Sequence, residues 1–214
     1  MQTQTVLTQT VLTRKPYRLV LASASPARRA LLSSAGIDVD VLVSGVDESV
    51  VEANEPDKLS LELARMKART VAARMPGEAG VLILGCDSVL SFDGQILGKP
   101  RDADEAVARW RAMRGKSGVL YTGHHLAELG TGKEAEEVGA TTVYFGEVSD
   151  EEIEAYVASE EPLHVAGSFT IDGRGGAFVE RIEGDAGNVI GLSLPLLRRL
   201  LGKLGISITA LWRP

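Results

Sequence analysis

The chain has 214 residues, of which 44% are hydrophobic and 24% are charged, and its formal net charge is −6 at pH 7. This composition is typical of a soluble globular protein and excludes disorder of the whole chain, while the negative charge excludes a general attraction to long nucleic acid. The single cysteine, Cys86, excludes an intramolecular disulfide, and no apolar run reaches the roughly 18 residues of a membrane-spanning helix. We therefore expect a cytoplasmic protein without membrane contact.

The N-terminal residues repeat Thr, Gln, Val and Leu, and they lack the charged start and long apolar centre of a signal peptide. We interpret residues 1–16 as a flexible extension. Residues 17–214 contain no repeat and no clear linker, which predicts a single domain of ordinary size.

The folded part begins with the pattern of an α/β protein. The apolar run Arg18–Ala22 predicts a strand, and Ser25 and Pro26 are residues favoured at the start of a helix. We therefore expect a helix over Ala27–Ala35 and a second strand over Val39–Val43. The order strand, helix, strand favours an α/β fold.

The middle of the chain continues this alternation. Asp57–Arg74 has apolar residues at helical spacing, and the continuous apolar run Val81–Leu84 predicts a strand buried on both faces, which Gly85–Ser88 follows. The acidic segment Glu128–Gly139 is interpreted as the mobile tip of a hairpin. The other expected elements are a strand over 89–92, a turn at Asp93–Gly94, a helix over Asp102–Arg114, strands over Val119–Leu126 and Ala140–Val148, a helix from Ser149 to about Ser159, a strand over Ala177–Glu183 and a helix over Pro195–Leu204.

The first candidate site is the turn between the first strand and the first helix. It carries Ser23, Ser25 and Arg28. A helix N-terminus offers free N–H groups and a partial positive charge, so hydroxyl groups and an arginine there could bind phosphate. The alternative is an ordinary capped helix with surface arginines.

Two carboxylates form the second candidate site. Asp87 is expected just past a buried strand, and Glu48 lies in the acidic loop after the second strand. Together they could hold Mg²⁺, and one of them could orient or deprotonate a water molecule. The alternatives are a turn aspartate and a solvated loop charge.

Lys67 and Lys99 are candidates for neutralising phosphate charge, although a surface role is the alternative for each. Gly173 and Arg174 belong to a glycine-rich stretch that either contacts a ligand or forms tight turns. Several motifs are absent: a Walker A loop, a Rossmann fingerprint, HExxH and Gly-x-Ser-x-Gly. Cys86 is interpreted as a packing residue.

Taken together, these segments resemble the Maf family of nucleotide pyrophosphatases. No single segment is very specific, but the ordered set is. The matching segments are Leu21–Arg28, Val46–Glu48, Leu63–Ala68, Gly85–Val89, Gly98–Pro100, Tyr121–Gly123, Glu161–Leu163, Ala166–Phe169, Gly173–Gly176 and Val189–Leu192.

The resemblance implies a Maf/ITPase-like α/β fold, with a long mixed sheet flanked by helices and two lobes around a nucleotide cleft. It implies hydrolysis of nucleoside triphosphates to monophosphate and pyrophosphate with Mg²⁺ or Mn²⁺, a house-cleaning role and a possible homodimer. By position, Asp87 matches the catalytic aspartate and proton acceptor. The other matches are Glu48, Lys67 and Lys99 in the active site and Ser23, Ser25 and Arg28 at the phosphates. Ser88, which stands where many members have threonine and keeps the hydroxyl, is expected to bind the substrate as well.

Two features separate this chain from many members. Ala27 replaces the first of two arginines that follow the proline, which bears on phosphate affinity. The segment Leu163–Phe169 is closer to the subgroup acting on 7-methyl-GTP than to the pyrimidine subgroup, and we expect broad specificity. The alternative function is a nucleotide-sensing regulator of cell division without essential catalysis, against which the retention of Glu48 and Asp87 argues.

Overall fold

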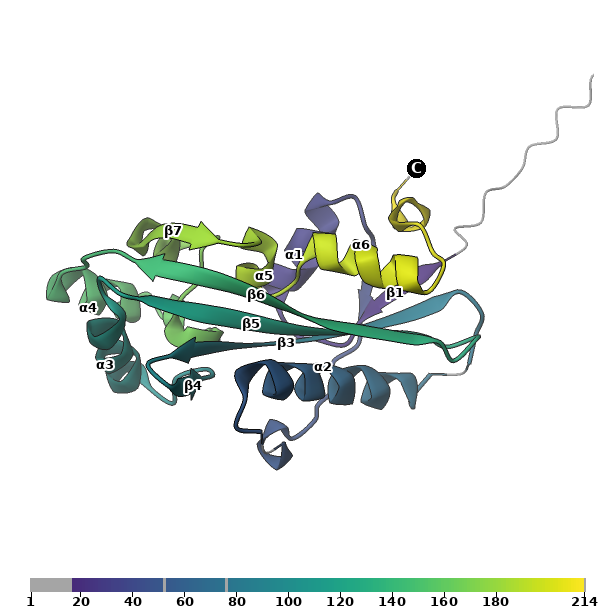
Figure 1. The fold of residues 1–214 in the computed structure, drawn as a ribbon, viewed down its shortest axis with the longest axis horizontal. Helices are drawn as coiled ribbons and strands as arrows, with labels where there is room; N and C mark the ends of the chain where they lie inside the picture. Colours follow the sequence, from purple (N-terminus) through teal and green to yellow (C-terminus); the bar gives the residue numbers. More distant parts are fainter. Residues whose placement is uncertain (1–16, 52, 76, 214) are drawn as a thin grey trace, which may run out of the picture.

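A computed structural model describes residues 17–51, 53–75 and 77–213, and the extension predicted over residues 1–16 lies outside these ranges. A mixed sheet of seven strands runs the length of the molecule (Figure 1). Its order is β2-β1-β3-β5-β6-β7, with β4 paired to β3. The strands are β1 (Arg18–Leu21), β2 (Val39–Val41), β3 (Val81–Phe92), β4 (Gln95–Leu97), β5 (Ser117–Glu128), β6 (Glu134–Phe145) and β7 (Val179–Glu183). The α/β prediction is confirmed.

Helices cover both faces of this sheet. In Figure 1, α2 lies on one face, whereas α1 and α6 lie on the other. The helices are α1 (Pro26–Ser34), α2 (Pro56–Ala72), α3 (Ala103–Met113), α4 (Asp150–Ala158), α5 (Ala186–Ile190) and α6 (Leu194–Lys203), with 3-10 turns η1 (Glu48–Val50), η2 (Glu161–His164), η3 (Ala166–Ser168), η4 (Arg174–Phe178) and η5 (Ile208–Leu211). Within the described ranges, no helix has the length and apolar character needed to cross a membrane.

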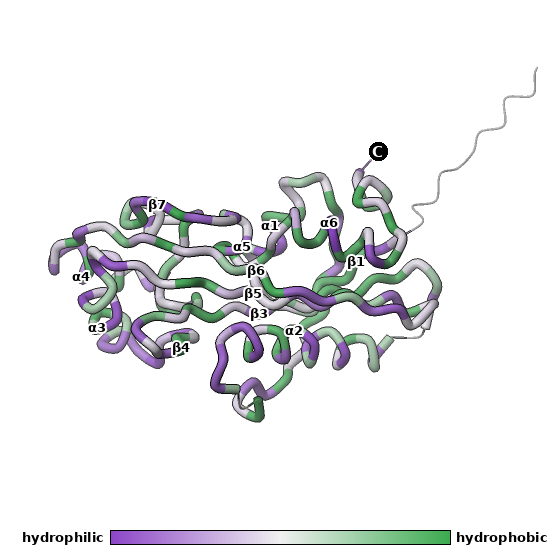
Figure 2. Tube along the Cα trace, viewed as in Figure 1, coloured by the Kyte–Doolittle hydropathy of each residue, from purple (hydrophilic) through white to green (hydrophobic). Residues whose placement is uncertain are grey.

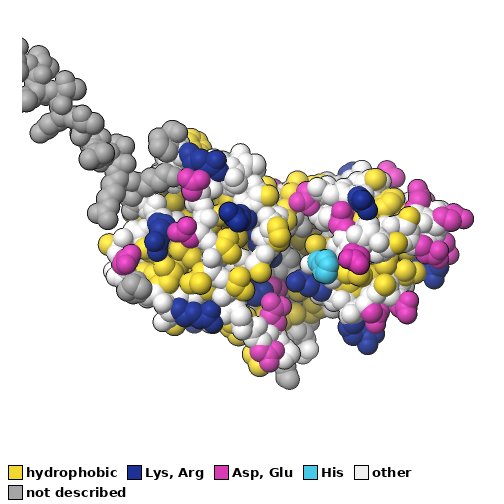
Figure 3. Space-filling model, turned by 180° about the vertical axis from the view of Figure 1, so that it is seen from behind, with side chains coloured by type: hydrophobic (Ala, Val, Ile, Leu, Met, Phe, Trp, Pro, Cys, Tyr) yellow, Lys and Arg dark blue, Asp and Glu magenta, His cyan; other side chains and the backbone are white. Residues whose placement is uncertain are grey.

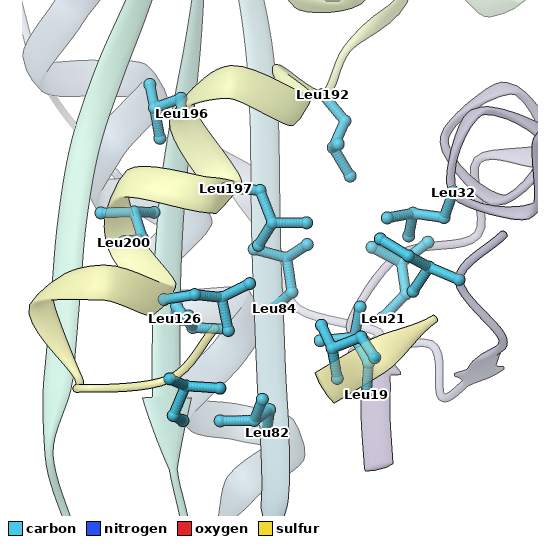
Figure 4. Close-up of a cluster of buried hydrophobic side chains, with 14 of the residues drawn as sticks. Leu19, Leu21, Leu32, Leu82, Leu84, Leu126, Leu192, Leu196, Leu197 and Leu200 are labelled. Carbon is cyan, nitrogen blue, oxygen red and sulfur yellow. The ribbon is translucent and has the colours of Figure 1, made fainter. Parts of the chain in front are cut away.

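The alternation of side chains along β1 divides the core into two layers. Leu19 and Leu21 pack with leucines of α6 and with Leu32 of α1 (Figure 4), whereas Val20 and Ala22 pack against α2. Figure 2 shows hydrophobic and hydrophilic residues alternating along α2, which is the pattern of a helix with one buried face. Because a core layer lies on each face of the sheet, the strands at its centre are continuously apolar.

A second core lies at the other end of the long strands. Trp110 of α3 is fully buried and makes edge contacts with Phe145, Tyr156 and Phe178. Its indole N–H donates to the backbone oxygen of Ser168 at 2.7 Å. Because β3, β5 and β6 extend into both cores, one sheet joins the two halves of the molecule.

The predicted helix starts are confirmed at three N-caps. The Ser25 hydroxyl accepts from the backbone of Arg28, Asp102 caps α3, and Ser149 forms a capping box with Glu152. These interactions are local in sequence, so the residues themselves specify them.

The prediction that Asp87 follows a strand end is wrong. β3 is continuous from Val81 to Phe92, and Asp87 lies inside it opposite Gly123 of β5. Gly85 does not begin a turn: a Cβ there would lie 2.1 Å from the backbone oxygen of Ala64. The glycine therefore allows α2 to approach the strand closely.

The interpretation of Glu128–Gly139 as a mobile tip is also wrong for most of its length. Only residues 129–133 connect the strands, and β6 begins at Glu134. The acidic side chains form ion pairs with basic residues of the covering helices, Glu136 with Arg65 at 2.6 Å and Glu137 with Lys203 at 2.7 Å. The helix α5 was not expected from the sequence.

Candidate active site

The structure brings together three predicted residues from different elements. Lys67 on α2 pairs with the Asp87 carboxylate on β3, and its Nζ lies 2.7 Å from Oε1 of Glu48 on η1. The side chains of Lys67 and Asp87 are each 11% exposed, whereas that of Glu48 is 56% exposed. One ammonium group thus holds a buried carboxylate beside one that faces solvent.

Burial controls the charge of Asp87. Removal from water raises the pKa of the Asp87 carboxyl, and the nearby Glu48 charge raises it further. The positive charges of Lys67 and Arg28 act in the opposite direction. A carboxylate with a raised pKa is a better proton acceptor, which is the property required of a general base.

The turn between β1 and α1 holds Arg28 inside the protein. The guanidinium donates from Nη1 to Oγ of Ser23 at 3.0 Å, from Nη2 to Oγ of Ser88 at 3.1 Å, and from Nε to the Gly191 oxygen at 2.7 Å. Arg28 is only 8% exposed. The alternative of a surface arginine is therefore wrong for Arg28, while Ser25 serves as the helix N-cap.

The surface of the molecule is hollowed. Figure 3 shows two lobes with a depression between them, in which acidic and basic side chains gather. A pocket next to the β1–α1 turn is lined by Ser23, Ser25, Arg29 and Val41, among others. Arg29 is exposed, unlike Arg28, and offers a second positive charge near the place where Ala27 replaces an arginine.

Among the described residues, no hydrogen bond or ion pair joins Lys99 or the Gly173–Arg174 segment to this cluster. Lys99 is exposed and forms no ion pair with any residue that the structure describes. The backbone N–H groups of Arg174 and Gly175 donate to Glu161, each at 3.0 Å, which is the role of a tight turn. A ligand contact for Lys99, Gly173 and Arg174 therefore stays a prediction.

Two other polar groups near the site are structural. Cys86 is fully buried and its pKa is raised to about 12 by burial, as expected of a packing residue. Burial lowers the pKa of His124 to about 4, so this ring is neutral. Its Nε2 accepts from the backbone N–H of Ser193 at 2.9 Å, and its Nδ1 donates to the Thr122 oxygen at 3.0 Å.

Sequence reasoning missed the groups that hold Arg28 and Ser88. Gly191 accepts directly from Arg28, and the Thr122 hydroxyl lies 2.9 Å from that of Ser88. Both residues belong to segments that carry the family resemblance, Tyr121–Gly123 and Val189–Leu192. Only their position in these family-matching segments could have pointed to Gly191 and Thr122, since glycine and threonine by themselves do not suggest a contact with Arg28 or Ser88.

The donor set suits a metal ion that arrives with a ligand. Among the described residues, no group of three or more His, Cys, Asp or Glu side chains could hold a metal. Glu48 and Asp87 supply two carboxylates, and one or two carboxylates together with substrate phosphates are a common way to bind Mg²⁺. The residues present therefore fit a metal that is shared with a phosphate-bearing ligand.

Comparison with known proteins agrees with this geometry. Residues 18–204 match the family model described as Maf-like protein. The chain is 62% identical to a protein of Salinispora tropica over 199 residues, covering 92% of this chain and 88% of that protein. It is 60% identical to a Streptomyces coelicolor protein (92% and 95% covered) and 51% identical to one from Trichormus variabilis (93% and 100% covered). All three are named nucleoside triphosphate pyrophosphatase.

Proposed function

Because this chain belongs to the Maf family, we propose that it hydrolyses nucleoside triphosphates between the α- and β-phosphates, releasing a nucleoside monophosphate and pyrophosphate. The observation that carries this proposal is the buried Asp87–Lys67 pair beside Glu48, next to the turn that holds Arg28. A buried carboxylate and positive charges lie in this one cluster, which supports a role in phosphoryl chemistry.

Asp87 is the proton acceptor in this mechanism. As the oxygen of the attacking water bonds to phosphorus, a proton of that water passes to the Asp87 carboxylate. The bond from phosphorus to the bridging oxygen breaks, and the electron pair leaves with pyrophosphate. Burial raises the pKa of Asp87, which favours uptake of the proton during the reaction.

Positive side chains stabilise the phosphate oxygens. Arg28 is held rigidly by its three hydrogen bonds, so its remaining N–H groups are available to a phosphate without further ordering of the side chain. Lys67 keeps Asp87 and Glu48 together. The exposed Lys99 is proposed to neutralise the charge that develops on the leaving group.

Glu48 and Asp87 are the residues that would hold a divalent cation, Mg²⁺ or Mn²⁺. When bound with the triphosphate, such an ion supplies charge neutralisation at the phosphate oxygens. The exposed Glu48 side chain is free to turn from Lys67 toward this ion, whereas Asp87 is fixed in the strand.

The finer points of the proposal concern substrate and setting. We propose broad specificity for the base, including methylated or otherwise non-standard nucleotides, with a house-cleaning role in the cytoplasm and a homodimer as the assembly. The support is the family resemblance and the segment Leu163–Phe169, and ultracentrifugation would test the dimer.

A substrate panel tests the reaction. Ordinary, methylated and deaminated triphosphates are incubated with the protein and Mg²⁺, and pyrophosphate is measured separately from orthophosphate. We expect pyrophosphate and monophosphate in equal amounts, and release of orthophosphate alone would refute the proposal. Asp87→Asn should keep the fold and nucleotide binding but lose most turnover, so full activity in this variant would refute the role of Asp87.

A further inference from the structure

The hydroxyl groups of Ser88 and Thr122 extend the hydrogen bonding of Arg28, and only one assignment of donors and acceptors is possible for them. The Thr122 hydroxyl lies 2.8 Å from the backbone oxygen of Asn188 and 2.9 Å from the Ser88 hydroxyl. A carbonyl oxygen only accepts, so Thr122 must give its single proton to Asn188. Ser88 must then give its single proton to Thr122, which leaves the Ser88 oxygen to accept from Arg28.

This direction decides what Ser88 can do. Its proton is committed to Thr122, so its hydroxyl has nothing left to donate to a phosphate. Its oxygen instead fixes Nη2 of Arg28 at 3.1 Å. Ser88 therefore acts on a substrate through Arg28, in contrast to the direct substrate contact expected from the sequence.

This series of hydrogen bonds ends at α5, and the residue after α5 also accepts a hydrogen bond from Arg28. Asn188 belongs to α5, and Gly191, which follows that helix, accepts directly from Nε of Arg28 at 2.7 Å. A Cβ at position 191 would lie 3.0 Å from this nitrogen, so the glycine leaves room for the guanidinium. The backbone of this short segment thus supports Arg28 twice, directly at Nε and through Thr122 and Ser88 at Nη2.

The support itself is rigid. Asn188 is 1% exposed, and its Nδ2 donates to the Leu120 oxygen of β5 and to the Thr141 hydroxyl of β6, each at 3.1 Å. Thr122 is fully buried on β5. Strands β5 and β6 therefore fix α5, and through it the position of Arg28.

We infer that Thr122 is a positioning residue for the proposed phosphate-binding arginine. By orienting the Ser88 hydroxyl, it commits Nη2 of Arg28 to Ser88, while Ser23 takes Nη1 and Gly191 takes Nε. Of five guanidinium N–H groups, one on each terminal nitrogen stays without a partner in the described part of the chain. Two such donors suit a phosphate group. This inference rests on the proposed function.

A double-mutant cycle in the full-length protein tests it. Thr122→Val removes the hydroxyl with little change of shape, and we expect kcat/KM for the triphosphate to fall roughly tenfold to a hundredfold. Thr122→Ser keeps the hydroxyl and should stay within about threefold of wild type. In an Arg28→Lys background, Thr122→Val should cost less than about threefold, because the group it positions has been removed.

Several outcomes would overturn the inference. The first is an equal loss of kcat/KM on Thr122→Val in both backgrounds, which is the result of general damage to the core. Ser60→Ala is the matched control, since it removes a buried α2 hydroxyl that donates to the Asp57 oxygen at 3.0 Å and has no link to Arg28. An equal loss in this control would also overturn the inference.

Two further measurements keep the test decisive. If Thr122→Val does not fold, Ser88→Ala removes the same series of hydrogen bonds. Its loss of kcat/KM should likewise vanish in the Arg28→Lys background. A loss that persists there would indicate that Ser88 binds phosphate itself and would overturn the inference. The same cycle is measured as Kd for an α,β-methylene triphosphate by calorimetry. Wild-type protein that releases no pyrophosphate refutes the proposed function, while the cycle in Kd still decides the role of Thr122.

Discussion

Replacing Gly85 by alanine should separate α2 from β3 and so misalign Lys67 with Asp87. The added Cβ would lie 2.1 Å from the Ala64 oxygen and 3.0 Å from the Ala68 Cβ. Ordinary contact begins near 3.4 Å, so the helix and strand must move apart by roughly 1.3 Å. Lys67 lies between these two alanines on the same helix and moves with them.

Two effects of different size follow from this movement. Overpacking of a core costs about 1–3 kcal/mol, and each kcal/mol lowers Tm by about 2–4 °C in a chain of this length. A misplacement of about 1 Å at a reacting group costs on the order of 10²-fold in rate. We therefore expect Gly85→Ala to lose about a hundredfold in kcat while remaining folded at 25 °C.

Pyrophosphate release and thermal unfolding followed by circular dichroism measure the two effects separately. Gly202→Ala is the matched control: nothing lies within 4 Å of a Cβ there, and the residue is in the last turn of α6, where helical backbone favours alanine over glycine. Wild-type kcat in Gly85→Ala, with or without a lower Tm, would refute the idea that the close packing of α2 on β3 aligns Lys67.

Two predictions concern pH. Lys67→Met removes a charge that lowers the pKa of Asp87, so this pKa rises and the acid limb of the normalised pH–kcat/KM profile should move to higher pH. Lys58→Met on the same helix is the control. An unmoved acid limb in Lys67→Met would contradict the assignment of Asp87 as the base. The hydrogen bond from Arg65 lowers the pKa of Glu136 from 4.5 to about 2, so its contribution to stability is complete above about pH 4.5 and is lost as the pH falls toward 2. Tm of Glu136→Gln should therefore fall less steeply than that of wild type across this range, and equal slopes for the two proteins would contradict the prediction.

The local features of the fold were predictable because they depend on neighbours in sequence. Ser25, Asp102 and Ser149 cap helices through groups within three residues, and Asp93–Gly94 form the expected turn with positive φ at both positions. The continuous strand at Asp87 was not predictable in this way, since pairing with β5 and packing against α2 both come from distant segments.

The acidic segment Glu128–Gly139 was wrongly interpreted as a mobile tip for the same reason, since its partners are distant in sequence. Glu134, Glu136 and Glu137 look like a solvated loop until their partners on α2 and α6 are known. At the site, residue type and order identified Glu48, Lys67, Asp87 and Arg28, but the geometry was needed to distinguish a buried arginine from a surface one. The positioning of Arg28 by Thr122 was likewise invisible, because threonine in a strand is common.

The sharing of β3, β5 and β6 between both halves has an evolutionary consequence. Asp87, Ser88 and Thr122 lie within strands whose registers depend on pairing along their whole length. A substitution that shifts one of these registers would therefore displace all three side chains together. Changes along the long strands are accordingly expected to affect the reaction even when they lie far from these residues in sequence, and this restricts how the scaffold can change in evolution.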